Sequence, residues 1–190
     1  MYRRVYGDDV RNVYQVTRLC YPGAAQLPTM ASHLETLIHE YLEWQGYLVR
    51  RNVKVGRRAK GGWEMELDLI GYNPVSVHLV HYEPSLDALS WEKREQRFQK
   101  KFAAARKYLY SEIFPWLPAD SKLEQFAVLP NASEARAQIA GGTLVSVDKL
   151  VAEIRKKVIA CGVMARNAIP EGFPLLRTLQ MSHVGYFRAL

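Results

Sequence analysis

The strongest hydrophobic pattern in the chain lies between residues 30 and 46 and has the spacing of a helix. Its apolar positions recur every three or four residues: Met30, Leu34, Leu37, Ile38, Tyr41, Leu42 and Trp44. Residues at this spacing share one face of a helix, and Gly46 is a typical stop signal. The pattern therefore predicts a helix that begins at Thr29 or Ser32 and ends before Gly46.

Strand-like runs follow this helix. Residues 47–55 predict the first strand, and the glycine-flanked basic turn at 56–62 ends it. Residues 63–70 and 75–83 predict two more strands, separated by the turn sequence GYNP at 71–74. Because two strands joined by a short turn pair with each other, we expect a β-hairpin here.

Helical spacing returns after Pro84 and Ser85. A long helix is predicted up to Pro115, and its apolar face consists of Trp91, Phe98, Phe102, Ala105 and Leu109. The remaining predicted elements are a strand at 125–129, a short helix near 133–140, a strand at 143–145 and a helix at about 147–160. Together with the preceding elements, they predict an α/β fold.

The chain has the length of a single domain. With 190 residues, one core suffices, and we expect residues 1–190 to form one domain with its core at about 30–160. A helical pattern at 9–20 predicts a helical N-terminal extension. The C-terminal stretch 169–180 is apolar and interrupted by prolines, so we expect it to pack on the domain, on a second copy in a homodimer, or on a protein partner.

Composition and charge favour a soluble, basic, cytoplasmic protein. No stretch approaches the roughly 20 apolar residues of a membrane span, and the first residues lack the pattern of a secretory signal. The two cysteines, Cys20 and Cys161, lie far apart and match neither a disulfide framework nor a metal site. The net charge of +7 favours a polyanionic partner such as DNA rather than a membrane-spanning role.

Acidic residues gather in the predicted hairpin and in the helix before it. Glu66 and Asp68 lie two apart in one strand and therefore share a face, and Glu83 ends the next strand. In the helix, a rotation of 100° per residue places Glu35 at the margin of the apolar face. Hard divalent cations bind carboxylate oxygens and assist phosphodiester hydrolysis, so these acids could form one site if the hairpin register allows.

Each acid also has a purely structural interpretation. Glu35 could close a capping box with Ser32, three residues earlier. Glu66 and Asp68 could form the solvent face of a half-buried strand. Glu83 could be an ordinary residue at the end of a strand. The order of the acids along the chain is what favours a common site.

That order resembles the PD-(D/E)XK nuclease superfamily, particularly its Mrr-like and RecB-like branches. Residues 34–47 (LETLIHEYLEWQGY) are similar to the family's opening helix and its Gly-aromatic exit. Residues 66–71 (ELDLIG) resemble the strand with the metal-binding Asp, and residues 77–83 (VHLVHYE) resemble the strand that ends in the (D/E)xK element. The resemblance in element order covers roughly residues 30–160 and implies a restriction endonuclease-like fold, with a central mixed β-sheet flanked by helices.

The resemblance also implies an activity and a set of site residues. It implies a DNA endonuclease that depends on Mg²⁺ or Mn²⁺, with Asp68 and Glu83 as metal ligands and Glu35 as an auxiliary carboxylate. A catalytically inactive protein of the same fold, which binds nucleic acid or a protein partner, is the alternative. An interaction module in a larger assembly is a third possibility.

The lysine of the family motif is missing from its usual position. If Glu83 begins the motif, Ser85 stands where the lysine is expected, and a serine cannot supply the positive charge that stabilises the transition state. The alternative register puts His81 at the first acidic position and Glu83 at the lysine position. The next helix offers replacements in Lys93, Lys100 and Lys101, of which Lys101 lies nearest the apolar boundary and is sterically the best placed.

Two basic groups are predicted to contact phosphates. One is the stripe on the long helix opposite its apolar face, formed by Lys93, Arg97, Lys100 and Lys107. The other is the turn that contains Arg57, Arg58 and Lys60. Each phosphate contact by such a group adds salt-sensitive affinity. The alternative is an ordinary solvated helix face and an exposed hairpin tip.

Other hydrolase signatures lack support. The sequence HEYLE at 39–43 lacks the second histidine of a zinc-binding HExxH motif, and Glu40 and Glu43 are predicted on the solvated side of their helix. Gly141 and Gly142 are not followed by the GK[ST] of a phosphate-binding loop. No serine lies in a GxSxG nucleophile elbow.

Overall fold

The protein contains a six-stranded mixed sheet, seen in a computed structural model that describes residues 32–118, 121–130, 132, 136–162 and 167–183. The strands are β1 (Leu48–Arg57), β2 (Trp63–Asn73), β3 (His78–Pro84), β4 (Leu123–Leu129), β5 (Gln138–Ile139) and β6 (Gly142–Ser146). Their order in the sheet is β1-β2-β3-β4-β6-β5. Pairing is antiparallel between β1, β2 and β3, parallel from β3 through β4 to β6, and antiparallel again between β6 and β5.

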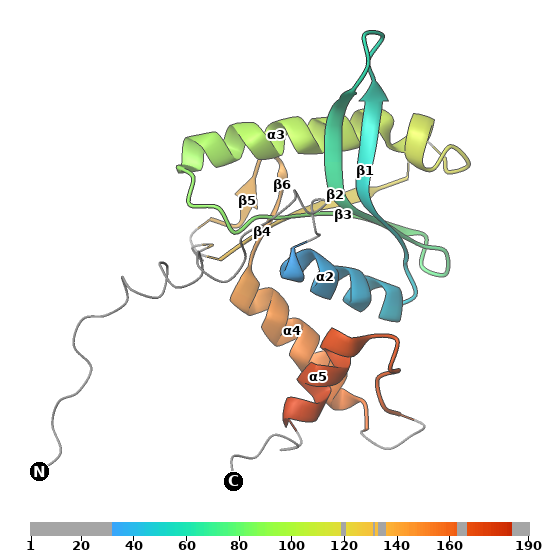
Figure 1. Ribbon diagram of the computed structural model, residues 1–190, viewed down its shortest axis with the longest axis vertical. Coiled ribbons are helices and arrows are strands. Elements are labelled where there is room, and N and C mark those ends of the chain that lie inside the picture. The colour runs from blue at the N-terminus through green and yellow to red at the C-terminus, as the bar shows by residue number, and fades with distance from the viewer. Residues whose placement is uncertain (1–31, 119–120, 131, 133–135, 163–166, 184–190) are drawn as a thin grey trace, which may run out of the picture. The chain divides into compact units, whose positions relative to one another are not determined.

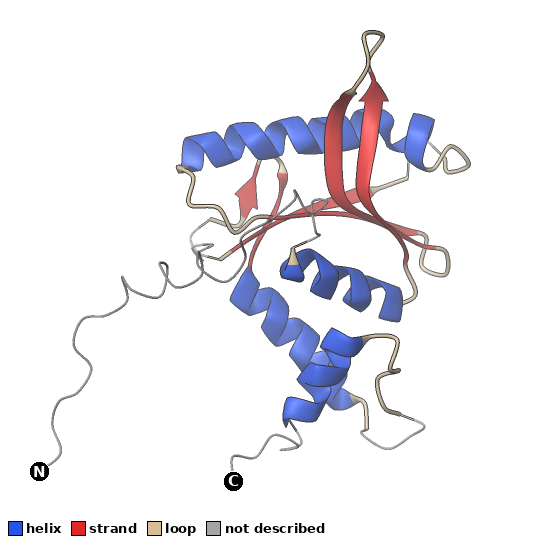
Figure 2. Ribbon diagram, viewed as in Figure 1, coloured by secondary structure: helices blue, strands red, loops and turns tan. Residues whose placement is uncertain are grey.

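Helices cover both faces of the sheet (Figure 1). Helices α2 (His33–Trp44) and α4 (Val147–Ala160) lie on one face, where α5 (Pro174–His183) packs outside them, and α3 (Trp91–Tyr108) lies on the other face (Figure 2). A π-helical turn (Leu109–Ile113) extends α3. Serine hydroxyls cap the start of α2, α3 and α4 and are contributed by Ser32, Ser90 and Ser146. Each accepts an N–H that the helix itself leaves unpaired.

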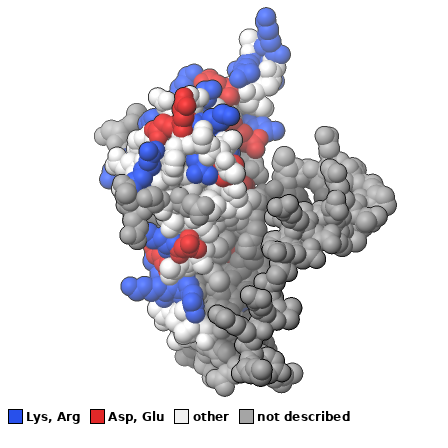
Figure 3. Space-filling view, turned by 90° about the vertical axis from the view of Figure 1, so that its left-hand side faces the viewer, with Lys and Arg blue, Asp and Glu red and all other residues white. Residues whose placement is uncertain are grey.

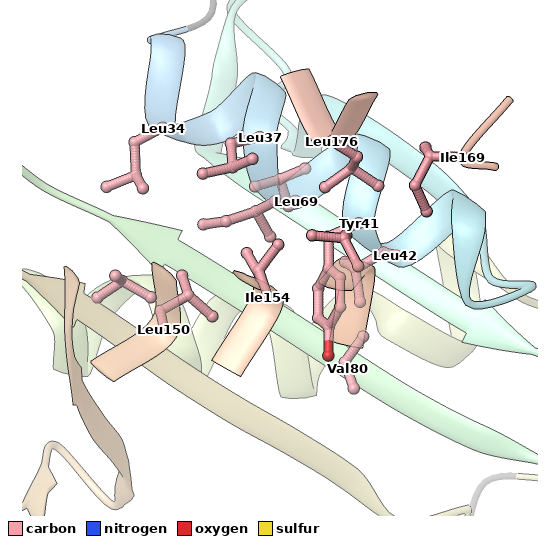
Figure 4. Close-up of a cluster of buried hydrophobic side chains, with 13 residues drawn as sticks. Leu34, Leu37, Tyr41, Leu42, Leu69, Val80, Leu150, Ile154, Ile169 and Leu176 are labelled. Carbon is pink, nitrogen blue, oxygen red and sulfur yellow. The ribbon is translucent and has the colours of Figure 1, made fainter. Parts of the chain in front are cut away.

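The hydrophobic core is divided by the sheet. One cluster joins the apolar face of α2 to β2, β3, α4 and α5, and its members Leu34, Leu69 and Ile154 are at most 6% exposed (Figure 4). Two further clusters lie under α3, one around Leu67 and the other around Phe102. The α/β fold with a mixed sheet flanked by helices, which the sequence predicts, is therefore confirmed.

The turn of the β2–β3 hairpin differs from the prediction. Residues 71–73 continue β2, and the chain turns between Pro74 and Val77 instead. The Asn73 carboxamide accepts the backbone N–H groups of Val75 (2.9 Å) and Ser76 (3.0 Å), which is the typical way an Asn starts a turn. Val77 has a φ of 52°, so β3 begins at His78 rather than at 75.

Two other predicted elements need comment. The short helix near 133–140 is wrong over its described part, because Gln138 and Ile139 form the edge strand β5 and pair with Thr143 and Gly142. The helix predicted at 9–20 lies outside the described residues, as do Cys20 and Thr29. The single-domain boundaries and the N-terminal extension therefore stay predictions.

The apolar C-terminal stretch packs back on the domain. Ile169 and Leu176 are buried in the cluster that contains α2 and α4. The prediction that Glu40 faces solvent is wrong: Glu40 is only 6% exposed, and its Oε2 accepts the N–H groups of Leu175 (2.8 Å) and Leu176 (3.2 Å). A carboxylate at the start of a helix satisfies unpaired N–H groups and complements the helix dipole, so Glu40 holds α5 against α2.

Among the described helices, none combines the length and the hydrophobicity that crossing a bilayer requires.

Candidate functional site

The hairpin register brings Asp68 and Glu83 together. Strands β2 and β3 pair Leu69 with Tyr82 and Ile70 with His81, and one step further along this register Asp68 lies opposite Glu83. The backbone N–H of Asp68 donates to Oε1 of Glu83 at 3.1 Å. The strand ladder thus ends in a bond from a main-chain amide to the Glu83 side chain.

A local distortion of β2 turns Asp68 toward α3. Leu67 packs in the cluster under α3, whereas Leu69 packs in the cluster with α2. In a regular strand, residues two apart share a face, so the alternation is broken at Asp68. On the neighbouring strand β1, Arg51 pairs with Leu69 and Val53 pairs with Leu67, so Asn52 lies opposite Asp68. Asn52 has a φ of 51°, a left-handed conformation that Asn tolerates better than most residues. Such irregularities re-aim side chains, often at functional sites.

Lys101 on α3 completes the cluster. Its Nζ lies 2.5 Å from Oδ1 of Asp68 and also donates to Oε2 of Glu83. The side chains of Asp68, Glu83 and Lys101 are 15%, 1% and 11% exposed. Phe98, Phe102 and Ala105 on α3 are buried against the sheet, and this packing fixes the helix rotation that points Lys101 inward. One ammonium group therefore bridges two nearly buried carboxylates.

Burial sets the protonation of this cluster. Desolvation, followed by the negative charge of Glu83, raises the pKa of Asp68 to about 7 even though Lys101 opposes the shift. Burial also raises the pKa of Glu83. Burial alone would lower the pKa of Lys101, but the two carboxylates outweigh it and raise that pKa above its ordinary value. Lys101 stays charged, and Asp68 can exchange a proton near neutral pH.

A buried histidine supports Glu83 from the side away from Lys101. His81 is fully buried, and its Nε2 lies 2.8 Å from Oε1 of Glu83. Its Nδ1 lies 3.2 Å from Nε2 of Gln125 on β4, and its ring meets the edge of Phe102. Burial and then the positive charge of Lys101 lower the pKa of His81 to about 3, so the imidazole is neutral.

Ser85, at the expected lysine position, belongs to a neighbouring network. Its hydroxyl donates to Asp87, and Arg97 donates to both Ser85 (3.3 Å) and Asp87 (2.6 Å). Arg94 adds two further bonds to Asp87. This network packs the loop before α3 against the helix, and Ser85 contributes no group to the Lys101 cluster.

The other candidate lysines do not reach the two acids. Lys93 and Lys100 are exposed. The choice of Lys101 as the replacement for the missing lysine therefore agrees with where its ammonium lies, although its catalytic role stays a prediction.

Glu35 does not join the cluster through a direct bond. Its backbone N–H donates to the Ser32 hydroxyl at 3.1 Å, which forms one half of the capping box. Within the described ranges, no group of three or more His, Cys, Asp or Glu side chains is arranged to hold a metal ion. The auxiliary metal role of Glu35 stays a prediction.

The basic residues fall into two kinds. Arg57, Arg58 and Lys60 lie at the exposed tip of the β1–β2 hairpin, which projects from the molecule (Figures 1 and 3). Lys93 and Lys100 are exposed as predicted. Arg97 and Lys107 are different, because both are already paired: Arg97 with Asp87 and Lys107 with Glu64, at 3.0 Å.

Three supporting residues carried no signal in the sequence. Gln125, Arg106 and Asp87 are ordinary polar residues, and the partners of Gln125 and Arg106 lie 19 or more positions away in sequence. Gln125 reaches His81 only because β4 pairs in parallel with β3 in a register that sets these two residues side by side. Covariation between such positions in related sequences is the kind of signal that could have found them.

Comparison with known protein families and with curated proteins finds no match for this chain.

Proposed function

We propose that this protein is a divalent-metal-dependent nuclease of the PD-(D/E)XK type that hydrolyses phosphodiester bonds in DNA. The observation that carries the proposal is the convergence of Asp68, Glu83 and Lys101 at one nearly buried point. Two carboxylates can bind a metal ion that polarises a phosphate, and an ammonium group beside them can stabilise developing negative charge. The order of α2, β1, β2, β3 and α3 further supports kinship with that superfamily.

The carboxylates fit a hard cation. Mg²⁺ retains several waters and is commonly bound through one or two carboxylates together with substrate phosphates, so Asp68 and Glu83 suffice as protein ligands. A bound cation would supply polarisation of the phosphate and a lower pKa for a coordinated water. The Asp68 side chain is 15% exposed and the Glu83 side chain 1%, so substrate would approach the cluster from the side of Asp68.

Lys101 would supply positive charge near the reacting phosphate. Its ammonium is held by both acids, and its raised pKa keeps it charged. A charge that is already oriented stabilises a developing negative charge without reorganisation. Lys101 thus replaces the lysine that the chain lacks at Ser85.

The exposed cations would hold the DNA backbone. The hairpin tip with Arg57, Arg58 and Lys60 projects beyond the sheet (Figure 1), and Lys93 and Lys100 are exposed on α3, which also carries Lys101. Phosphate contacts of this kind orient a duplex without reading its sequence.

Plasmid nicking tests the proposal. Supercoiled plasmid is incubated with the wild type, Asp68→Asn or Glu66→Gln in Mg²⁺, Mn²⁺ or EDTA. Glu66 lies two residues before Asp68, is about half exposed and forms an ion pair with Lys54 at 4.0 Å, so its variant is a matched control. We expect metal-dependent nicking by the wild type and Glu66→Gln, and a loss of at least about 100-fold in Asp68→Asn. Nicking that persists in Asp68→Asn would refute the site.

One observation favours a second function. The Lys101 ammonium already bridges both carboxylates, and a protein cation in that place can substitute for a metal ion. The protein would then be an inactive nuclease-fold protein that binds nucleic acid. Salt-sensitive DNA binding by the wild type without nicking in either metal, together with unchanged binding by Asp68→Asn, would support this second function.

A further inference from the structure

The two oxygens of Glu83 have different surroundings. Oε1 accepts the N–H of Asp68 (3.1 Å) and faces Nε2 of His81 (2.8 Å), whereas Oε2 faces Lys101. Glu83 is 1% exposed, so water cannot replace a missing donor. The carboxylate therefore keeps this orientation only while Nε2 of His81 carries a proton, because an unprotonated nitrogen would oppose Oε1 with a lone pair.

Gln125 decides which nitrogen of His81 is protonated. Its Nε2 lies 3.1 Å from the carbonyl oxygen of Phe102, which can only accept, and its Oε1 accepts a bond from Arg106. These two contacts fix the orientation of the carboxamide. The second N–H of Nε2 then donates to Nδ1 of His81 at 3.2 Å. A neutral imidazole that accepts at Nδ1 must carry its proton on Nε2.

We propose that His81 and Gln125 are positioning residues: Gln125 locks His81 in the Nε2–H tautomer, and His81 thereby holds Oε1 of Glu83 so that Oε2 remains the oxygen presented to Lys101 and to a bound cation. The consequence for catalysis rests on the proposed nuclease function, but the tautomer lock does not. Arg106 anchors the chain of bonds at the surface, where its side chain is exposed.

The tautomer is measurable without any metal or substrate. Long-range ¹H–¹⁵N correlation spectra of the wild type should show a protonated Nε2 and an unprotonated Nδ1 for His81. Gln125→Met keeps the length of the side chain but removes both donors, so the second tautomer should become populated and both nitrogen shifts should move toward each other. A protonated Nδ1 in the wild type, or unchanged shifts in Gln125→Met, would overturn the proposal.

A matched pair at position 81 tests the consequence for function. His81→Gln retains an N–H that can reach Oε1 of Glu83, whereas His81→Met has a similar size and no donor. Loss of a residue that orients a metal ligand typically costs about 10- to 100-fold in metal affinity or activity. We expect Mn²⁺ affinity and nicking to fall by that factor in His81→Met relative to His81→Gln.

The two proposals fail separately. Equal Mn²⁺ affinity in both folded variants at position 81 would overturn the positioning role even if the wild type nicks DNA. No nicking by the wild type would instead remove the nuclease function, and the tautomer measurement would still decide the lock. If His81→Met does not fold, the comparison of Gln125→Met with the wild type takes its place, with the same expected fall in Mn²⁺ affinity.

Discussion

Two lysines of α3 form ion pairs with acids of β2 in very different surroundings. Lys101 pairs with Asp68, where both side chains are at most 15% exposed, and Lys107 pairs with Glu64, where they are 59% and 42% exposed. Both pairs therefore join a lysine of α3 to a carboxylate of β2. The exposed pair is screened by water and by salt, whereas the buried cluster raises the pKa of Asp68 to about 7. Burial, rather than the presence of a pair, produces unusual proton chemistry.

Removal of Lys101 should have the largest effect on stability. Lys101→Met leaves two buried carboxylates without their cation, and breaking such a cluster typically costs about 3–5 kcal/mol. Urea unfolding at pH 8 measures the loss. Lys107→Met is the control, and its unfolding midpoint should match that of the wild type. Equal losses in the two variants would show that burial does not distinguish the pairs.

The loss in Lys101→Met should depend on pH. Without Lys101, which lowers the pKa of Asp68, that pKa rises further above 7, while the unfolded chain releases the same proton near pH 4. Between these values the folded protein holds a proton that the unfolded chain has lost, so stability falls as pH rises. The variant should therefore be closest to the wild type near pH 5, and the opposite trend would contradict the assignment.

Asp68→Asn should separate stability from function. At pH 8 the wild type must keep a desolvated Asp68 ionised against its raised pKa, and the carboxamide removes that cost. We expect an increase in the free energy of unfolding at this pH, alongside the loss of nicking. A decrease in stability, measured by the same urea titration, would mean that the Lys101 pair outweighs the desolvation of Asp68.

Glu40 is a buried acid of another kind, because its partners are backbone N–H groups rather than a lysine. Glu40→Gln keeps the size of the side chain and one acceptor but removes the charge at the start of α5. We expect a loss of about 1 kcal/mol. Hydrogen exchange of the Leu175 and Leu176 amides should accelerate, and unchanged exchange would show that Glu40 does not hold α5.

The cations of the hairpin tip should affect DNA binding and leave stability unchanged. Replacement of Arg57, Arg58 and Lys60 by Gln removes three exposed charges. If all three contact phosphates of a duplex, the slope of log affinity against log salt should become shallower by about 2.7. Fluorescence anisotropy titrations of labelled duplex DNA from 50 to 300 mM salt measure this slope. An unchanged slope would remove the tip from the interface.

Local sequence patterns predicted much of the fold, and the order of the acids along the chain selected Asp68 and Glu83, which the structure brings together. Helical spacing located α2, α3 and α4, and the helical boundary position of Lys101 singled it out from Lys93 and Lys100. The proximity of Asp68 and Glu83 could not be predicted without the β2–β3 register. This register depends on the turn at Asn73 and on the distortion of β2 opposite Asn52. These features involve backbone angles that residue types alone do not determine.

Long-range partners could not be foretold in the same way. The sequence predicts that Glu40 faces solvent, because no pattern at 169–180 identifies the helix α5 that covers it. Gln125 meets His81 only through the parallel pairing of β4 with β3, which brings together residues 44 positions apart. Helical and strand periodicity describe one element at a time and contain no information on such pairs.

The carboxyl pKa of Asp68 provides the most direct test of the coupled site. Carbon-detected NMR titration of metal-free wild type and Lys101→Met would measure it. A pKa near 7 in the wild type that rises further in Lys101→Met is the predicted result. A value near 4 that is the same in both proteins would contradict the coupling of Asp68, Glu83 and Lys101.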